Sequence, residues 1–189
     1  MKTIENKDFG IFLEKTHFLA TCQTNGRMIY EEPFRLTSVL IDSLLRIKTY
    51  MIETNMKGRF QLKKNLFICG SKLTGKTCFM ALLKTLIDES ERFQIRSCME
   101  IEHQTKKYGN SYLNSFFRKH SRSWCFDDFG KRDTHAHLKI LKNILKNIAR
   151  TKSNIPYHII SDYSIEELEL LLGKKYSKQI THDFIIFHF

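Results

Sequence analysis

Apolar and polar positions follow a repeating order along most of this chain, in which short apolar runs alternate with longer segments of helical spacing. The apolar runs have the length of buried strands and lie at residues 65–69, 93–99, 123–130, 157–161 and 184–189. The segments with helical spacing lie at residues 76–90, 101–120, 137–151 and 164–173. Strands that alternate with helices form a parallel sheet covered on both faces, so the pattern predicts an α/β fold.

Two of the predicted helices carry additional signals. Residues 137–151 place their leucines on one face, as an amphipathic helix does. In the other helix, Ser164 and Glu167 have the spacing of a capping box, and Gly173 suits the helix end. These two segments are therefore well-defined helices in the prediction.

The first 55 residues are less regular. Residues 1–36 are mixed, and the sequence TNGR at Thr24–Arg27 is typical of a turn. Residues 37–55 have helical spacing, and Ser38 is a candidate cap for that helix. We therefore predict one helix in this region, preceded by a turn-rich segment.

A polar, basic link over residues 56–64 separates this region from the rest of the chain. The chain has 189 residues, a length that suits one domain with small additions. We therefore predict a small N-terminal region with a helix over residues 1–56 and a core over residues 57–189.

A phosphate-binding motif lies between the first strand of this core and the helix that follows. The stretch GSKLTGKT, Gly70–Thr77, matches the P-loop pattern G-x-x-x-x-G-K-[ST] in full. Its glycines let backbone N–H groups approach phosphate oxygens, Lys76 reaches the β- and γ-phosphates, and the Thr77 hydroxyl binds Mg²⁺. The sequence therefore predicts a nucleotide site with Mg²⁺, formed by Gly70, Ser71, Lys72, Leu73, Thr74, Gly75, Lys76, Thr77 and Cys78.

Two carboxylates end the predicted strand at residues 123–130. Ligands of open α/β sheets bind at the carboxyl ends of the strands. We predict that Asp127 holds Mg²⁺ through water, and that Asp128 orients or deprotonates the attacking water. Together with the P-loop, these acids predict hydrolysis of a nucleoside triphosphate.

The same acidic stretch fits two other classes of nucleotide-dependent protein. Asp127–Gly130 matches the D-x-x-G of GTPases, but the nearest guanine-reading segment, Thr151–Asn154, ends in Asn instead of Asp. Asp128–Gly130 spells the metal motif of protein kinases, whose other motifs are absent from the sequence. The sequence therefore favours ATP, and a GTPase or a small-molecule kinase is an alternative.

The chain is strongly basic, with a net charge of +11 from 31 Lys and Arg against 20 Asp and Glu. Such an excess favours polyanionic partners, above all nucleic acid. One cationic stripe either contacts a phosphate backbone or is a solvated helix face, and consists of Lys139, Lys142, Lys146 and Arg150. A second cluster combines cations with rings that either stack on bases or pack in the core, and consists of Tyr112, Phe116, Phe117, Arg118, Lys119, His120 and Arg122. We predict salt-sensitive, sequence-tolerant binding of DNA, single-stranded in particular.

Cysteine usage and hydropathy indicate the compartment. The five cysteines have no metal-binding spacing, and they suit a reducing cytoplasm. No stretch reaches the ~18 apolar residues that a membrane span needs, and the first residues show no signal-peptide pattern. We therefore expect a cytoplasmic protein that has no membrane partner.

Four stretches together resemble the DnaC/IstB-type AAA+ ATPases, which are bacterial helicase loaders and helper ATPases of transposons. The stretches are residues 65–83, 124–131, 156–175 and 184–189, and the resemblance extends over about residues 62–189. It implies a P-loop NTPase fold of the AAA+ additional-strand type, without a helical lid domain. It also implies an ATPase that assembles with further copies of itself on DNA and acts on a protein partner, such as a replicative helicase or a transposase.

The resemblance also assigns individual residues. Asp162 stands at the sensor 1 position, which is usually Asn and contacts the γ-phosphate, so it joins Lys76 and Asp128 as a candidate catalytic residue. A carboxylate repels phosphate unless it is protonated or metal-bound, which makes Ser161 an alternative. The family's arginine finger has no counterpart here, and the candidates to replace it are Lys175, Lys178, Arg132 and Arg150. We therefore expect slow ATP hydrolysis in replication or transposition, or else a nucleotide-gated binding module with negligible turnover.

Overall fold

The central element of the molecule is a parallel sheet of five strands. The computed structural model describes residues 6–30, 34–55, 59–118, 122–151 and 155–189. The strands of this sheet are β3 (Leu66–Cys69), β4 (Gln94–Ser97), β5 (Trp124–Asp127), β6 (Tyr157–Ser161) and β7 (Ile185–His188). Their spatial order is β4-β5-β6-β3-β7, so β6 lies between the P-loop strand and the acidic strand. This order confirms the predicted P-loop α/β fold of the additional-strand type.

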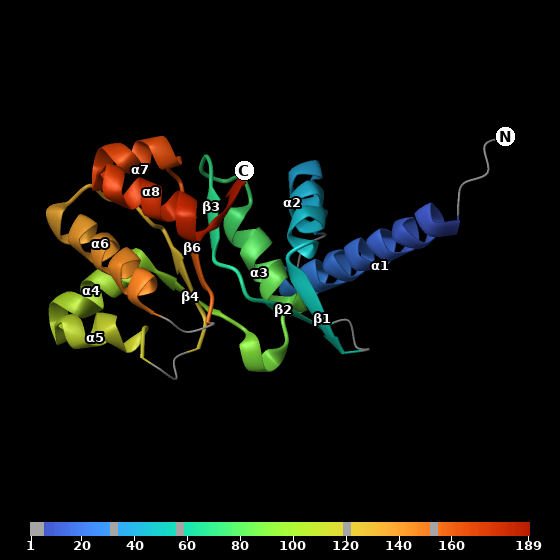
Figure 1. The fold of residues 1–189 in the computed structure, drawn as a ribbon, viewed down its shortest axis with the longest axis horizontal. Helices are drawn as coiled ribbons and strands as arrows, with labels where there is room; N and C mark the ends of the chain where they lie inside the picture. The colour runs from blue at the N-terminus through green and yellow to red at the C-terminus, as the bar shows by residue number, and fades with distance from the viewer. Residues whose placement is uncertain (1–5, 31–33, 56–58, 119–121, 152–154) are drawn as a thin grey trace.

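Helices cover both faces of the sheet, as Figure 1 shows. One side carries α1 (Asn6–Ile29), α2 (Ser38–Lys48) and α3 (Lys76–Leu86). The other side carries α4 (Cys98–Tyr108), α5 (Asn110–Ser115), α6 (His135–Arg150), α7 (Ile165–Leu172) and α8 (Lys174–Asp183). Successive residues of β3 point to opposite faces, so Ile68 packs in the first layer and Phe67 in the second.

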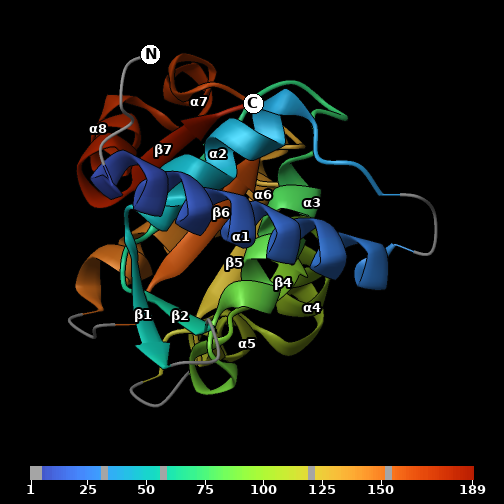
Figure 2. The same ribbon diagram turned by 90° about the vertical axis from the view of Figure 1, so that its right-hand side faces the viewer.

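Two short strands stand apart from the main sheet. β1 (Met51–Asn55) and β2 (Arg59–Leu62) pair antiparallel, with Met51 opposite Leu62. A single turn of 3₁₀ helix, Glu89–Glu91, precedes β4. In Figure 2, α1 lies across α2 and α3, and the β1–β2 pair lies below them. Among the described residues, no helix combines the length and the apolar character needed to cross a membrane.

The predicted turn at Thr24–Arg27 is wrong, because α1 continues through it. Gly26 allows the Phe34 ring to lie directly against the helix, where a Cβ would come within 2.2 Å of that ring. The segment after α1 is held in place by Gln23, whose side chain donates to the Phe34 carbonyl and accepts from the Leu36 amide. Tertiary packing at the glycine therefore outweighs the local turn preference.

The helix predicted over residues 37–55 is shorter than expected. It ends at Lys48, and β1 takes up the residues that follow it. Its cap is Thr37 in place of the predicted Ser38, with the Thr37 hydroxyl accepting from the Leu40 amide at 3.3 Å. The helical spacing fails beyond Lys48 because pairing with β2 satisfies the backbone there. The predicted boundary between residues 56 and 57 lies outside the described residues, and the division into two regions stays a prediction.

The second half of the chain follows the prediction more closely. The capping box of α7 is formed, with the Ser164 amide bonded to the Glu167 carboxylate at 2.7 Å. The run at residues 93–99 yields a shorter strand, because α4 already begins at Cys98. The helix α8 follows α7 directly and is absent from the prediction, since its polar, lysine-rich sequence has only a narrow apolar side.

A buried polar pair joins α4 to α6. His137 Nδ1 lies 2.9 Å from Glu102 Oε2, and Lys106 donates to the other carboxylate oxygen at 2.6 Å. The hydrogen bond from Lys106 lowers the pKa of Glu102, and the hydrogen bond from His137 acts in the same direction although burial opposes them. The ionised carboxylate of Glu102 is therefore the form that the folded protein favours.

We expect Glu102→Gln to lower the free energy of unfolding at pH 7 by about 1–3 kcal/mol, because it removes a charged acceptor from a buried hydrogen-bonded group. Since the folded-state pKa of Glu102 is lowered, its contribution is complete above the unfolded pKa of about 4.3 and is lost as the pH falls through the folded value. Urea unfolding followed by circular dichroism at several pH values measures this difference. Glu100→Gln, on the exposed side of α4, is the control. Equal losses for both variants would contradict the assignment.

Candidate functional site

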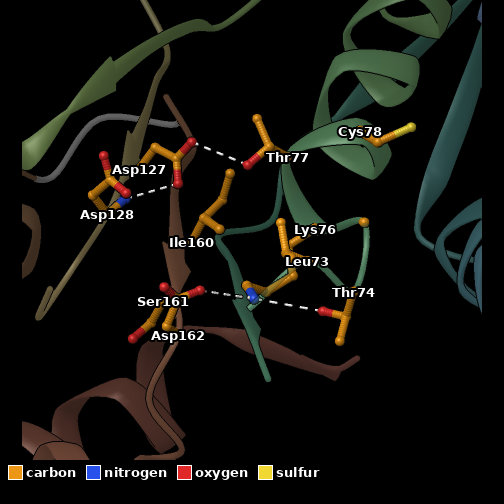
Figure 3. Close-up of a pocket in the computed structure, with 11 residues that line it drawn as sticks. Leu73, Thr74, Lys76, Thr77, Cys78, Asp127, Asp128, Ile160, Ser161 and Asp162 are labelled. Carbon is orange, nitrogen blue, oxygen red and sulfur yellow. Dashed lines mark hydrogen bonds and ion pairs between the residues drawn. The ribbon is translucent and has the colours of Figure 1, made fainter. Parts of the chain in front are cut away.

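A cavity of about 300 Å³ opens at the carboxyl ends of β3, β5 and β6. Figure 3 shows its lining, in which the P-loop faces the ends of the other two strands. The lining residues are Leu73, Thr74, Gly75, Lys76, Thr77, Cys78, Asp127, Asp128, Ile160, Ser161 and Asp162. The structure therefore brings the predicted loop and the predicted acids together around one space.

The shape of the P-loop depends on two glycines. Gly70 has φ 143°, and a Cβ there would lie 2.0 Å from the backbone oxygen of Phe189, at the end of β7. Gly75 has φ 94° and directly precedes α3. Close backbone approach excludes a side chain at Gly70, and the positive φ disfavours one at Gly75. The local backbone therefore accounts for glycine at both positions, as the sequence motif predicts.

Lys76 is buried at the centre of the loop, with a side chain only 5% exposed. Its ammonium donates to the carbonyl oxygens of Gly70 at 2.9 Å and Ser71 at 2.5 Å. It also forms an ion pair with Asp162, with Nζ 2.9 Å from Oδ1. The loop therefore surrounds this charge with carbonyl oxygens, and the carboxylate of Asp162, which follows β6, is a further acceptor.

The start of α3 presents groups that suit an anion and a metal. Gly75 supplies no side-chain cap, so the first amides of the helix are left for another acceptor. The Thr77 hydroxyl donates to Asp127 Oδ2 at 3.2 Å, which joins the two predicted Mg²⁺ ligands (Figure 3). Mg²⁺ commonly uses one or two protein oxygens together with phosphate oxygens and water. This donor set therefore fits a nucleotide-associated Mg²⁺.

Asp128 is held by groups other than the P-loop. Ser97, the last residue of β4, donates to its Oδ2 at 2.8 Å, and Lys131 donates to its Oδ1 at 2.8 Å. Asp128 has the left-handed φ of 56°, which turns its side chain relative to that of Asp127. Burial raises the pKa of Asp128, but the hydrogen bonds from Lys131 and Ser97 more than offset it, so the net shift is downward. Asp128 is thus an ionised carboxylate with both oxygens engaged.

Asp127 has the opposite electrostatic environment. Burial raises the pKa of its carboxyl, and the neighbouring charges of Asp128 and Asp162 add to that effect. Hydrogen bonds from the Asp128 amide, at 2.7 Å, and from Thr77 work against the rise. A cation near Asp127 would relieve this carboxylate repulsion, which is the condition expected of a metal ligand.

The structure places the remaining predicted residues less centrally. Gly70 and Ser71 reach the site through carbonyls that bind Lys76, while Lys72 is exposed and outside the lining. Ser161, the alternative sensor, donates to the Phe129 carbonyl and accepts from the Tyr163 amide, so its hydroxyl supports the chain around the site. The candidates to replace an arginine finger are exposed and none lines the cavity: Arg132, Arg150, Lys175 and Lys178.

Sequence reasoning missed Ile160, which lines the cavity, and two residues that hold Asp128, Ser97 and Lys131. Ser97 ends a parallel strand at the same edge of the sheet as Asp127, which is the signal that could have found it. Lys131 follows the acids by three residues, and its partner is visible only once the turn after β5 is formed.

The two predicted nucleic-acid surfaces differ in how much of their side chains is exposed. On α6, Lys139, Lys146 and Arg150 are exposed, whereas Lys142 is half-buried with its ammonium 5.8 Å from the centre of the Tyr176 ring. In the second cluster, Phe116 is buried against Trp124, Phe126 and Tyr112, and the half-buried Phe117 stacks on Phe126. Burial of Phe116 therefore rules out base stacking by that ring, while base stacking by the half-buried Phe117 stays a prediction. Residues 119 and 120 of that cluster lie outside the described residues.

Comparisons with known proteins rest on the fold. No protein-family model and no curated protein matches the chain. A crystal structure of the DnaC helicase loader matches 83% of this chain and 94% of its own at 17% identity, with a TM-score of 0.66. A crystal structure of DnaI matches 80% of this chain and 85% of its own at 16% identity, with a TM-score of 0.59.

A third structure, AMPPCP-bound DnaA from Aquifex aeolicus, matches 82% of this chain but 48% of its own, at 14% identity and a TM-score of 0.53. The similarity to DnaC and DnaI extends over most of both chains. The chain therefore has the DnaC/IstB-type AAA+ fold that the sequence resemblance implied.

Proposed function

We propose that this chain binds ATP with Mg²⁺ in the P-loop cavity and hydrolyses it slowly. One observation carries the proposal: Lys76, Thr77 and Asp127 converge on a single cavity at the start of α3. Similarity of fold to an AMPPCP-bound DnaA supports nucleotide as the ligand class. ATP is preferred over GTP because the sequence lacks a matching guanine-reading segment.

Each residue then has a defined task. The uncapped amides of α3 and the Lys76 ammonium bind phosphate oxygens, and Thr77 and Asp127 hold the metal. When held by these residues, Mg²⁺ would supply positive charge against the phosphate oxygens. Asp128 is the candidate base, since a carboxylate next to the metal site can orient or accept a proton from water.

Two features support slow turnover. Asp128 is already bonded to Ser97 and Lys131, and it acts on water only after at least one of these bonds is released. In addition, no arginine is among the described residues that line the cavity. An arginine finger contributes about 10³–10⁵ in rate in GTPases that use one. A binding module whose assembly depends on nucleotide, with negligible turnover, is the second candidate, and the same two features favour it.

We further propose a role in DNA replication, as an ATPase that acts with DNA and a protein partner such as a replicative helicase. A role in transposition with a transposase is the alternative. The fold shared with the DnaC helicase loader and with DnaI supports the replication role. Assembly with further copies of the chain offers a route by which an exposed cation of one copy reaches the cavity of the next.

The proposed DNA-binding surface lies on α6 and α8, which pack against each other. Its exposed cations are Lys139, Lys146, Arg150, Lys174, Lys175 and Lys178. Cations arranged on adjacent helices suit a phosphate backbone, which carries no sequence information by itself. Binding through this surface is therefore expected to be sequence-tolerant and salt-sensitive.

We expect Lys76→Ala to weaken ATP binding by at least about tenfold, because it removes the buried cation that contacts the phosphates. Titration with a fluorescent ATP analogue in the presence of Mg²⁺ measures the affinity. Lys84→Ala, at the far end of α3 and outside the cavity, is the matched control and should bind as the parent chain does. Unchanged affinity in Lys76→Ala would exclude this cavity as the nucleotide site.

We expect Asp128→Asn to bind ATP with the parent affinity but to lower the rate of phosphate release by about 10²-fold, the scale of a positioned general base. Single-turnover hydrolysis measures the chemical step. Equal residual rates in Asp128→Asn, Lys76→Ala and the parent chain would leave the binding module as the function.

We expect replacement of Lys146 and Arg150 by Gln to weaken binding of single-stranded DNA. The slope of log affinity against log salt concentration should become less steep by about one to two units, because two phosphate contacts are lost. Fluorescence anisotropy across a salt series measures both quantities. The control removes Arg35, which precedes α2, and Lys84 of α3, two cations outside this surface. Equal effects of the two double variants would assign binding to net charge and not to this surface.

A further inference from the structure

The contact between Lys76 and Asp162 has a consequence for which nucleotide the site holds. An ammonium group has three N–H donors. In Lys76 they meet three close acceptors, the carbonyls of Gly70 and Ser71 and the carboxylate of Asp162, at 2.9, 2.5 and 2.9 Å. The Thr74 hydroxyl is a more distant fourth partner, at 3.5 Å. A phosphate that binds Lys76 must therefore replace one of these partners.

Asp162 is the partner that a phosphate replaces most directly. The two carbonyls belong to the loop itself, whereas Asp162 follows β6 on the opposite wall of the cavity. Figure 3 shows its carboxylate directed across the cavity at Lys76, as a bound anion would be. Its side chain is 25% exposed, so it can turn away without leaving a buried space.

Among the described residues, Asp162 forms an ion pair with Lys76 alone. Lys76 is the one cation among the described residues that line the cavity, and Lys131 is bonded to Asp128. The displaced carboxylate therefore stays at the cavity wall beside the bound phosphates. Like charges at such short range repel, and the repulsion grows with the charge of the terminal phosphate.

We propose that Asp162 is a specificity-determining residue that disfavours a γ-phosphate, so that the site favours nucleoside diphosphate relative to triphosphate. This inference rests on the proposed nucleotide site. The lysine of a P-loop reaches the β- and γ-phosphates, so both nucleotides must displace Asp162 from Lys76, and the triphosphate brings a further charged group to the same lysine and hence close to that carboxylate. The ratio of the two affinities therefore isolates the effect of Asp162 from its general competition for Lys76.

The experiment compares the dissociation constants of ADP and ATP, each with Mg²⁺, by isothermal titration calorimetry of the full chain. Asp162→Asn keeps the shape of the side chain and an oxygen that accepts from Lys76, and it removes the charge. We expect the dissociation constant of ATP divided by that of ADP to fall by about tenfold in this variant, because the neutral side chain no longer repels the added phosphate. Asp162→Ser, a second neutral variant, should shift the ratio in the same direction.

Asp133→Asn is the matched control, because Asp133 is exposed, precedes α6 and lies outside the cavity. It should leave the ratio unchanged. If the parent chain and Asp162→Asn bind both nucleotides with the same ratio, or if Asp162→Asn binds ATP more weakly, the inference is overturned and the nucleotide site stands. If neither protein binds nucleotide while both unfold cooperatively, the proposed function fails and the inference fails with it.

Discussion

The buried ammonium of Lys76 is the group on which the arrangement of the cavity depends. A charge removed from water must be surrounded by acceptors, or the fold loses more free energy than it gains from packing. Here the acceptors are the carbonyls of Gly70 and Ser71 and the carboxylate of Asp162. Carbonyls of the loop thus surround the cation, whereas a phosphate would be bound by N–H groups at the start of α3 and by Lys76 itself.

The sheet order decides which acids meet this cation. β6 lies between β3 and β5, so the residue that follows β6 faces the P-loop directly, and the acids of β5 approach it from beyond β6. The first of these acids, Asp127, contacts Thr77, and the second, Asp128, turns to Ser97 and Lys131. Among the described residues that line the cavity, three are carboxylates, and Asp127 is the one of them without an ion pair to a lysine. A divalent cation would correct this imbalance.

The sequence was enough to predict the features that follow from local pattern. The alternation of strands and helices, the P-loop and the capping box at Ser164 each depend on residues close together in the chain, and the structure has all three. The turn at Thr24–Arg27 failed because the decisive contact, between Gly26 and Phe34, is made by a segment that folds back. The β1–β2 pair was missed because cross-strand pairing outweighed the helical spacing of residues 49–55.

Within the site, prediction from sequence identified the residues but not their partners. Residue type and spacing pointed to Lys76, Asp127 and Asp128. No local pattern indicated that Asp162 would bind Lys76, because the two residues are 86 positions apart in the chain and meet only through the order of the strands. The same holds for Ser97, which is separated from Asp128 by a helix pair.

Ser97 connects the site to the helices beyond it. Its hydroxyl accepts from the Met99 amide at 3.2 Å, which caps α4, and it donates its proton to Asp128 at 2.8 Å. A hydroxyl has one proton and two lone pairs, so both bonds form at once. When Asp128 leaves Ser97, the cap of α4 persists and the hydroxyl proton must find another acceptor. A separate polar pair, Glu102 and His137, ties α4 to α6, so one helix makes polar contacts both with the acidic turn after β5 and with the helix that carries part of the basic surface.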